Sequence, residues 1–198
     1  AIPIHQDHYA LRLVEKLAEA GLDYYWSWAY NHIGFDIYNE GVSILSRKPL
    51  KARELLVSDV NDPSDYHTRK VLLAETELDG QPITVASCHL SWWDKGFQGE
   101  WAKFESELLQ VETPLVLMGD FNNPVDYEGY QHIIQSPLAL QDSHKVADQT
   151  IGTATVEGDI AGWAGSKDFN IERSAVVFDG QRGPVVSDHF GLEAQVHF

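Results

Sequence analysis

The chain has 198 residues, 30 of them acidic and 14 basic, so its formal net charge is −16. This length suffices for a single domain, residues 1–198, with a sizeable core, and no apolar run approaches the roughly 20 residues of a membrane span. Nucleic-acid binding relies on Lys and Arg opposite phosphates, so the acidic balance argues against a nucleic-acid partner. The single cysteine, Cys88, excludes an internal disulfide and is typical of a cytoplasmic protein. We expect Cys88 to be a small core residue.

An amphipathic helix is the first element that the sequence predicts. Apolar residues recur at helical spacing over Tyr9–Ala20, with polar residues between them. The side chain of Asp7 is suited to cap the start of this helix, and Gly21 is typical of a helix end. A second helix is indicated by the spacing of Trp101, Phe104 and Leu108. Its charged residues are expected to face solvent: Glu100, Lys103, Glu105 and Glu107.

Short apolar runs predict strands along most of the chain. These runs lie near Tyr24–Tyr30, Val42–Ser46, Lys70–Thr76, Ile83–Cys88, Leu115–Met118, Ala175–Phe178 and Leu192–Phe198. The stretch Gln149–Ser166 is rich in Gly and Thr and predicts a loop. Several strands with few helices between them favour two packed sheets.

Polar residues come directly after three short apolar stretches. His89 ends the run that begins at Thr84, and Asp120 and Asn122 come after Gly119, which allows a sharp turn. Asp188 and His189 follow Val185–Val186 near the end of the chain. Carboxylates, a carboxamide and two imidazoles at strand ends can hold a hard cation, orient a water molecule and move a proton. Each motif alone has a plainer explanation, such as an Asx-type turn at Asp120.

Four motifs in this order resemble the endonuclease/exonuclease/phosphatase superfamily, the metal-dependent phosphoesterases related to DNase I. They are Gly41–Pro49 (GVSILSRKP), Cys88–Leu90 (CHL), Gly119–Asn122 (GDFN) and Ser187–Phe190 (SDHF). The resemblance implies a four-layer α/β (α+β) sandwich, in which two packed, mostly antiparallel sheets are flanked by helices. It places the active site at the common edge of the sheets.

Two elements of that family have no counterpart in the sequence. One is the opening pair of strands, with an Asn and with a Gln-Glu whose Glu is a principal metal ligand. The other is a strand of the type Arg-Ile-Asp-Tyr, whose Asp pairs with the terminal His; its expected place reads Gly162–Asn170. We therefore expect an N-terminal strand and a segment near 166–167 to be missing. A truncated, inactive relative is the alternative.

The resemblance also implies roles for the motif residues. Asp188 would bind Mg²⁺ or Mn²⁺, which prefer oxygen ligands. His189 would take a proton from the attacking water or bind the phosphoryl group. Asp120 would align that water, Asn122 would donate an amide hydrogen to a phosphate oxygen, and His89 would lie near the phosphoryl oxygens or the leaving group.

Further residues indicate the substrate. Arg69 opens a strand and could contact phosphate, although a surface charge fits as well. Trp92, Trp93 and Trp163 follow or precede motif strands and could stack on a sugar, with core packing as the alternative. The HLSWW run and the acidic charge resemble the maltose 6'-phosphate phosphatase branch. Glu40 could pair with His89 but reads better as exposed, and His32 has no motif context.

Three classes of function remain open. A phosphatase acting on a small phosphorylated sugar in the cytoplasm fits the charge and the tryptophans best. A DNase I-like nuclease or a sphingomyelinase-like phosphodiesterase would share all the motifs. A non-catalytic binding module that has lost its metal site is the third class.

Overall fold

The computed structural model describes residues 3–153, 163–166 and 168–198, and for 163–166 the course of the main chain only. Its helices and strands, in chain order, are α1 (Tyr9–Glu19), β1 (Tyr25–Gly34), β2 (Tyr38–Ser46), β3 (Lys51–Leu56), β4 (Lys70–Leu78), β5 (Gln81–His89), η1 (Trp93–Lys95), α2 (Phe97–Leu108), β6 (Leu115–Asp120), α3 (Glu128–Ile134), β7 (Leu140–Asp142), α4 (Ser143–Val146), β8 (Gln149–Ile151), β9 (Trp163–Ser166), β10 (Asn170–Val177) and β11 (Gly191–His197). In this described part, no helix is long and apolar enough to cross a membrane.

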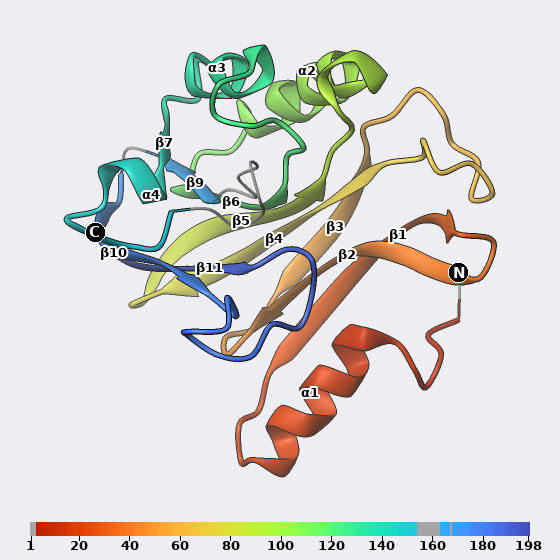
Figure 1. Ribbon diagram of the computed structural model, residues 1–198, viewed down its shortest axis with the longest axis horizontal. Coiled ribbons are helices and arrows are strands. Elements are labelled where there is room, and N and C mark those ends of the chain that lie inside the picture. Colours follow the sequence, from red (N-terminus) through yellow and green to blue (C-terminus); the bar gives the residue numbers. More distant parts are fainter. Residues whose placement is uncertain (1–2, 154–162, 167) are drawn as a thin grey trace.

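The centre of the fold is a six-stranded sheet with the order β3-β4-β5-β6-β9-β7. All its pairs are antiparallel except β5 and β6, which are parallel and are connected through α2. A parallel pair needs such a crossover, because its strands run in the same direction. Helices α2 and α3 cover one face of this sheet (Figure 1).

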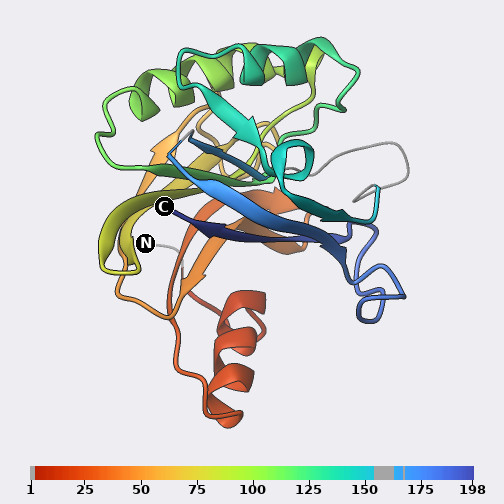
Figure 2. The same ribbon diagram turned by 90° about the vertical axis from the view of Figure 1, so that its left-hand side faces the viewer.

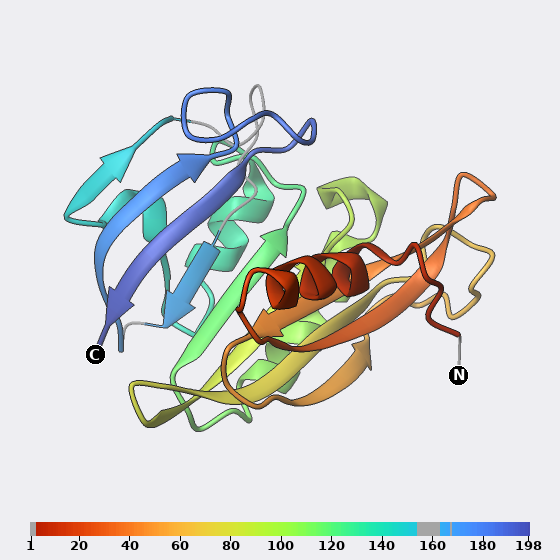
Figure 3. The same cartoon turned by 90° about the horizontal axis from the view of Figure 1, so that it is seen from below.

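A second layer of strands packs on the opposite face. It consists of the antiparallel β1-β2 ribbon and a three-stranded sheet with the order β11-β10-β8. Seen from the side, α2 and α3, the large sheet, the smaller sheets and α1 form successive layers (Figure 2). From below, α1 lies over the β1-β2 ribbon, beside the β8-β10-β11 sheet (Figure 3). The expected four-layer sandwich is therefore confirmed.

Alternation along the central strands produces two hydrophobic cores. In β4, Val71 and Leu73 face α2, whereas Leu72 and Ala74 face the second layer of strands. Successive side chains of a strand point to opposite faces, so a strand buried on both faces reads as an unbroken apolar run. Cys88 lies in the core on the helix side with 1% of its surface exposed, which confirms its expected structural place.

The two long helices form where the sequence predicts them, but two details are wrong. The N-cap of α1 is His8, whose side chain accepts a hydrogen bond from the N–H of Leu11, and not Asp7. Glu100 does not face solvent: it is 3% exposed and accepts hydrogen bonds from Ser91. A buried carboxylate is retained when nearby donors satisfy it, and a helical pattern cannot show such a partner.

The predicted strands also form, several of them longer than expected, and short ones appear between them. Part of the expected loop Gln149–Ser166 is strand, because β8 pairs with β10 at a sheet edge and β9 lies between β6 and β7, while 154–162 lie outside the described residues. Val185–Val186 is not the end of a strand; it belongs to an exposed loop between β10 and β11. Residue 167, where a lost segment was expected, also lies outside the described residues.

Candidate active site

The parallel pairing of β5 and β6 places two motif residues side by side. His89 is in register with Asp120, and each is the last residue of its strand. Gly119 makes this approach possible, because it has a φ of +133° and a Cβ at this position would lie 1.9 Å from the carbonyl oxygen of Cys88. Only glycine accommodates both the backbone conformation and the contact.

Asp120 lies between two histidines. Its Oδ2 is 3.3 Å from Nε2 of His189 and 3.7 Å from Nε2 of His89. His189 comes from the loop before β11, so it reaches Asp120 from the second layer of strands. The side chains of His89 and His189 are 40% and 42% exposed, and that of Asp120 is 23% exposed. The arrangement is an accessible carboxylate flanked by two groups that can carry protons.

The turn after β6 fixes the orientation of Asp120. The N–H of Asn122 donates to Asp120 Oδ1 at 2.9 Å, which is the Asx-type turn that the sequence allowed. Asn122 has a φ of +50°, and its Nδ2 donates to the carbonyl of Leu90 at 2.7 Å. Because Oδ1 is engaged within the turn, Oδ2 is the oxygen that meets the histidines. The Asn122 amide retains one hydrogen for another acceptor.

Electrostatics favour the neutral form of His89. Burial, followed by the positive charge of Arg69, lowers the pKa of its imidazole, while Asp120 and Glu40 oppose this shift. A neutral imidazole near pH 7 can accept a proton, as a general base requires.

Arg69 lies near three carboxylates at the same edge. Burial lowers the pKa of its guanidinium, and Glu100, Glu40 and Asp120 act in the opposite direction. Its Nε and Nη1 atoms are buried, and in the described part of the chain neither meets a hydrogen-bond acceptor. Buried donors without acceptors are unfavourable, so the position suits an anion that brings its own oxygens.

Three residues of this region, His32, Glu40 and Glu100, belong to none of the sequence motifs. Glu40 is not simply exposed: its Oε2 is 3.1 Å from Nε2 of His32, and its side chain is 36% exposed. Glu100 accepts from both the N–H and the hydroxyl of Ser91, two residues after His89, and so holds the loop that follows β5. The one sequence signal for them is position, since Glu40 precedes the GVSILSRKP motif directly.

Asp188 is the candidate metal ligand, and its side chain is 92% exposed. Hydrogen bonds from Ser187 and His189 lower the pKa of its carboxyl group, so the carboxylate form is favoured. Among the residues that the structure describes, no group of three or more His, Cys, Asp or Glu is placed to hold a metal ion. Asp188 alone supplies one oxygen-donor group and not a closed ligand set.

The candidate tryptophans are placed differently from one another. Trp92 is 46% exposed just beyond β5. Trp93 is partly buried against the core, with its ring 5.8 Å from that of Phe97 and 5.7 Å from that of His132. Trp163 begins β9, in register with Met118, and its side chain lies outside the described residues. Of these residues, Trp92 is therefore the one that is seen to be available to a ligand.

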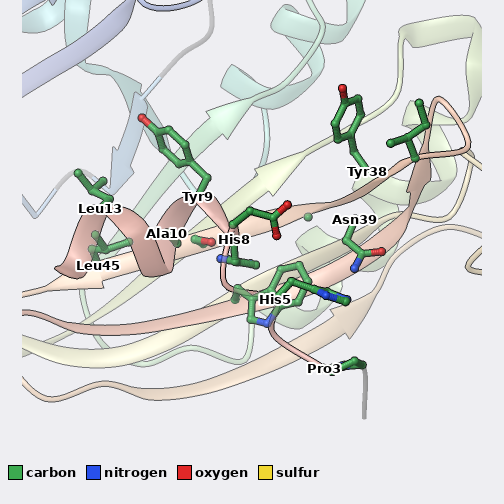
Figure 4. Close-up of a pocket in the computed structure, with 14 residues that line it drawn as sticks. Pro3, His5, His8, Tyr9, Ala10, Leu13, Tyr38, Asn39 and Leu45 are labelled. Carbon is green, nitrogen blue, oxygen red and sulfur yellow. The ribbon is translucent and has the colours of Figure 1, made fainter. Parts of the chain in front are cut away.

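A cavity of about 670 Å³ lies on the outer face of the β1-β2 ribbon, away from these residues. Figure 4 shows residues from α1 and the segment before it, including His5, His8 and Tyr9, opposite Tyr38 and Asn39 of β2. None of the motif residues at the ends of β5 and β6 lines it. Chemistry, and not cavity size, identifies the candidate site.

Comparisons with known proteins identify the family and the fold of this chain. The model of the Endonuclease/Exonuclease/phosphatase family matches residues 6–189. A solved structure of an endonuclease/exonuclease/phosphatase family protein from Leptotrichia buccalis C-1013-b has 27% identity and a TM-score of 0.88, over 100% of this chain and 81% of that chain. A search of curated proteins finds no match.

Two further solved structures share the fold at lower identity. A functionally unknown conserved protein from Enterococcus faecalis V583 has 23% identity and a TM-score of 0.74, over 94% of this chain and 81% of that chain. A mannosyl-6-phosphatase from Bacteroides thetaiotaomicron VPI-5482 has 18% identity and a TM-score of 0.73, over 95% of this chain and 82% of that chain. At these identities the likeness concerns the fold alone.

Proposed function

Because this chain belongs to the endonuclease/exonuclease/phosphatase family, we propose that it is a metal-dependent phosphomonoesterase that hydrolyses a small phosphorylated sugar. The observation that carries the proposal is the position of Asp120 between His89 and His189, with the charge of Arg69 nearby. Hydrolysis of a phosphate ester needs a positioned water, a proton acceptor and positive charge beside the phosphoryl oxygens. These four side chains supply all three.

Asp120 has the geometry to align the attacking water. Its Oδ1 is held by the N–H of Asn122, so Oδ2 keeps a fixed direction toward the two imidazoles. A water at Oδ2 would lie within reach of His189, which either takes its proton or binds the phosphoryl group. His89, favoured in its neutral form, would then face the other side of the reacting phosphate. The Asn122 amide would donate its free hydrogen to a phosphoryl oxygen.

Arg69 supplies the positive charge that the chain itself contributes. An incoming phosphoryl oxygen would be an acceptor for Nε and Nη1 of the guanidinium, which meet none within the described residues. Charge-assisted hydrogen bonds of this kind are the strong ones. We further propose Mg²⁺ or Mn²⁺ as the cofactor, with Asp188 as one ligand; when bound, it would neutralise charge on the non-bridging oxygens.

Charge and one exposed aromatic residue support a sugar phosphate over a polynucleotide. The net charge of −16 disfavours a long polyanion, whose binding relies on many phosphate contacts. Trp92, just past His89, offers an exposed indole face on which a sugar ring could stack. The mannosyl-6-phosphatase with the same fold is consistent with a phosphorylated sugar, maltose 6'-phosphate being one candidate.

Phosphate release from a panel of sugar phosphates in Mg²⁺ tests the proposal, beside plasmid nicking and sphingomyelin hydrolysis. We expect turnover of at least one sugar phosphate, lost in Asp120→Asn and reduced in kcat by about 10²-fold or more in His89→Ala and His189→Ala. The matched control is His197→Ala, which removes an exposed histidine of β11 away from the motifs. Plasmid nicking or sphingomyelin hydrolysis without sugar-phosphate turnover would replace the phosphatase assignment. No hydrolysis in any assay would favour a binding module.

A further inference from the structure

Two adjacent buried residues of β1, Asn31 and His32, hold the main chain on both sides of Arg69. Asn31 Oδ1 accepts a hydrogen bond from the N–H of Lys70 at 3.0 Å. His32 Nδ1 lies 3.0 Å from the carbonyl oxygen of Thr68. Asn31 and His32 are each 2% exposed. The peptide units before and after Arg69 are therefore each bound to the β1-β2 ribbon.

An irregularity of β1 turns both side chains inward. The register of β1 with β2 shifts between Tyr30 and His32, and four consecutive residues, from Ala29 to His32, are buried. In a regular strand, neighbours point to opposite faces; a bulge re-aims one of them. The turn between β1 and β2 and the loop between β3 and β4 lie on the same side of the molecule (Figures 1 and 3).

The main chain of Arg69 itself is held by a third segment. Its N–H donates to the hydroxyl of Ser58 at 2.8 Å, and its carbonyl accepts from the N–H of Val57 at 3.0 Å. The backbone groups of Thr68, Arg69 and Lys70, where β4 begins, are thus bound from two directions. Such a degree of fixation is expected where a side chain must be presented in one geometry.

His32 also fixes a carboxylate beside the same arginine. A carbonyl oxygen can only accept, so the Nδ1 of His32 carries the hydrogen toward Thr68. The other ring nitrogen, Nε2, lies 3.1 Å from Glu40 Oε2. This contact holds Glu40 in place near the guanidinium of Arg69, whose charge Glu40 supports.

We propose that Asn31 and His32 are positioning residues that hold Arg69 ready for a phosphoryl group. The inference rests on the proposed function in one respect: it assigns Arg69 to the phosphate of the substrate. A purely structural role for the two residues would affect stability without any special relation to Arg69. That difference can be measured.

A double-mutant cycle between His32 and Arg69 tests the proposal, with inorganic phosphate as the probe. Equilibrium phosphate binding is measured for the wild type, His32→Gln, Arg69→Met and the double variant. We expect each single variant to weaken phosphate binding about tenfold, the size of one charge-assisted hydrogen bond. The double variant should bind no more weakly than Arg69→Met, because residues that act as a unit are not additive.

A second pair of variants separates the two contacts of His32. His32→Asn keeps a donor near the position of Nδ1, facing Thr68, whereas His32→Gln keeps one near Nε2, facing Glu40. We expect His32→Asn to retain most phosphate affinity and a near-normal KM. We expect His32→Gln to raise KM for the sugar phosphate more than it lowers kcat. The reverse order would overturn the proposal.

Thr84→Val is the matched control. Thr84 is 5% exposed and its hydroxyl lies 2.7 Å from that of Thr113, near the opposite end of β5 from His89. The Thr84→Val variant loses one partly buried hydrogen bond and should unfold more easily without any change in phosphate affinity. Losses that add in the double variant, or a wild type that binds no phosphate, would overturn the inference. A wild type that binds phosphate but hydrolyses no sugar phosphate would overturn the proposed function alone, and the binding cycle would still decide the role of His32.

Discussion

Gly119→Ala should separate the two strands that carry His89 and Asp120. The new methyl group would lie 1.9 Å from the carbonyl oxygen of Cys88 and 2.9 Å from its nitrogen, so both contacts are with backbone that cannot rotate away. The φ of +133° adds strain for any residue with a Cβ. The substitution is therefore expected to act through a clash and through strain together.

The magnitude follows from these two contributions. Strain at a sparsely populated backbone conformation costs about 1–3 kcal/mol, and overpacking a filled site costs about 1–3 kcal/mol more. We expect the free energy of unfolding to fall by about 4 kcal/mol, a large part of the roughly 5–15 kcal/mol typical of a domain. Because the register places His89 beside Asp120, kcat should fall as well in the molecules that remain folded.

The free energy of unfolding is measured by urea denaturation, and two other glycines separate the contribution of strain from that of the clash in the same assay. Gly80 has a φ of +80° with nothing within 4 Å of a built Cβ, so Gly80→Ala measures strain alone. Gly99 lies in α2 with open space around it, so Gly99→Ala should stabilise by about 1 kcal/mol through helix propensity. A loss for Gly119→Ala no larger than that for Gly80→Ala, with normal kcat, would refute the close-approach argument.

Three further predictions concern the site. Asp188→Ala should lower turnover by orders of magnitude and weaken Mg²⁺ binding, and full activity in EDTA would contradict metal dependence. Trp92→Ala should raise KM for the sugar phosphate while leaving thermal stability unchanged. Trp93→Ala should lower thermal stability, since the ring of Trp93 packs against Phe97. Equal effects of the two variants on KM and on stability would argue against a binding role for Trp92 and a structural role for Trp93. Burial and the charge of Arg69 both lower the pKa of His89, so Arg69→Met should raise that pKa in an NMR titration. Because the pKa of His89 is lowered in the folded wild type, the contribution of His89 to the free energy of unfolding is fully present above about pH 6.5 and is lost as the pH drops toward the folded-state pKa. The variant should show a weaker loss over this pH range. An unchanged titration of His89 would rule out the effect of Arg69.

Local pattern predicted the long elements and the ends of the motif strands. Strands such as β4 and β5 are buried on both faces, so their apolar runs are unbroken, and His89 and Asp120 stand where those runs stop. The resemblance implied two packed layers of strands, which the structure has, although the second layer is divided into two sheets. Strands β8 and β9 escaped prediction because three or four residues carry too little periodicity, and they exist through pairing with strands far along the chain.

The support around the site could not be predicted, since its contacts are distant in sequence. His32 reaches Thr68 across 36 positions, and Asn31 reaches Lys70 across 39. Glu100 belongs to the charged side of a helix by pattern, yet it turns inward because Ser91 offers two donors. No local rule reports such a partner, and each case depends on the packing of separate elements.

The division of the site between two layers ties its chemistry to the core between the sheets. Asp120 ends a strand of the large sheet, whereas His189 precedes β11 in the second layer, so their 3.3 Å contact depends on how the layers pack. That packing is made by residues such as Val116 on β6 and, partly buried against the same core, Val196 on β11. Interiors are close-packed and transmit small displacements. A substitution in this core would therefore alter the angle at which His189 meets Asp120, even though no site residue is changed. For this reason we expect kcat to be more sensitive than KM to substitutions between the sheets.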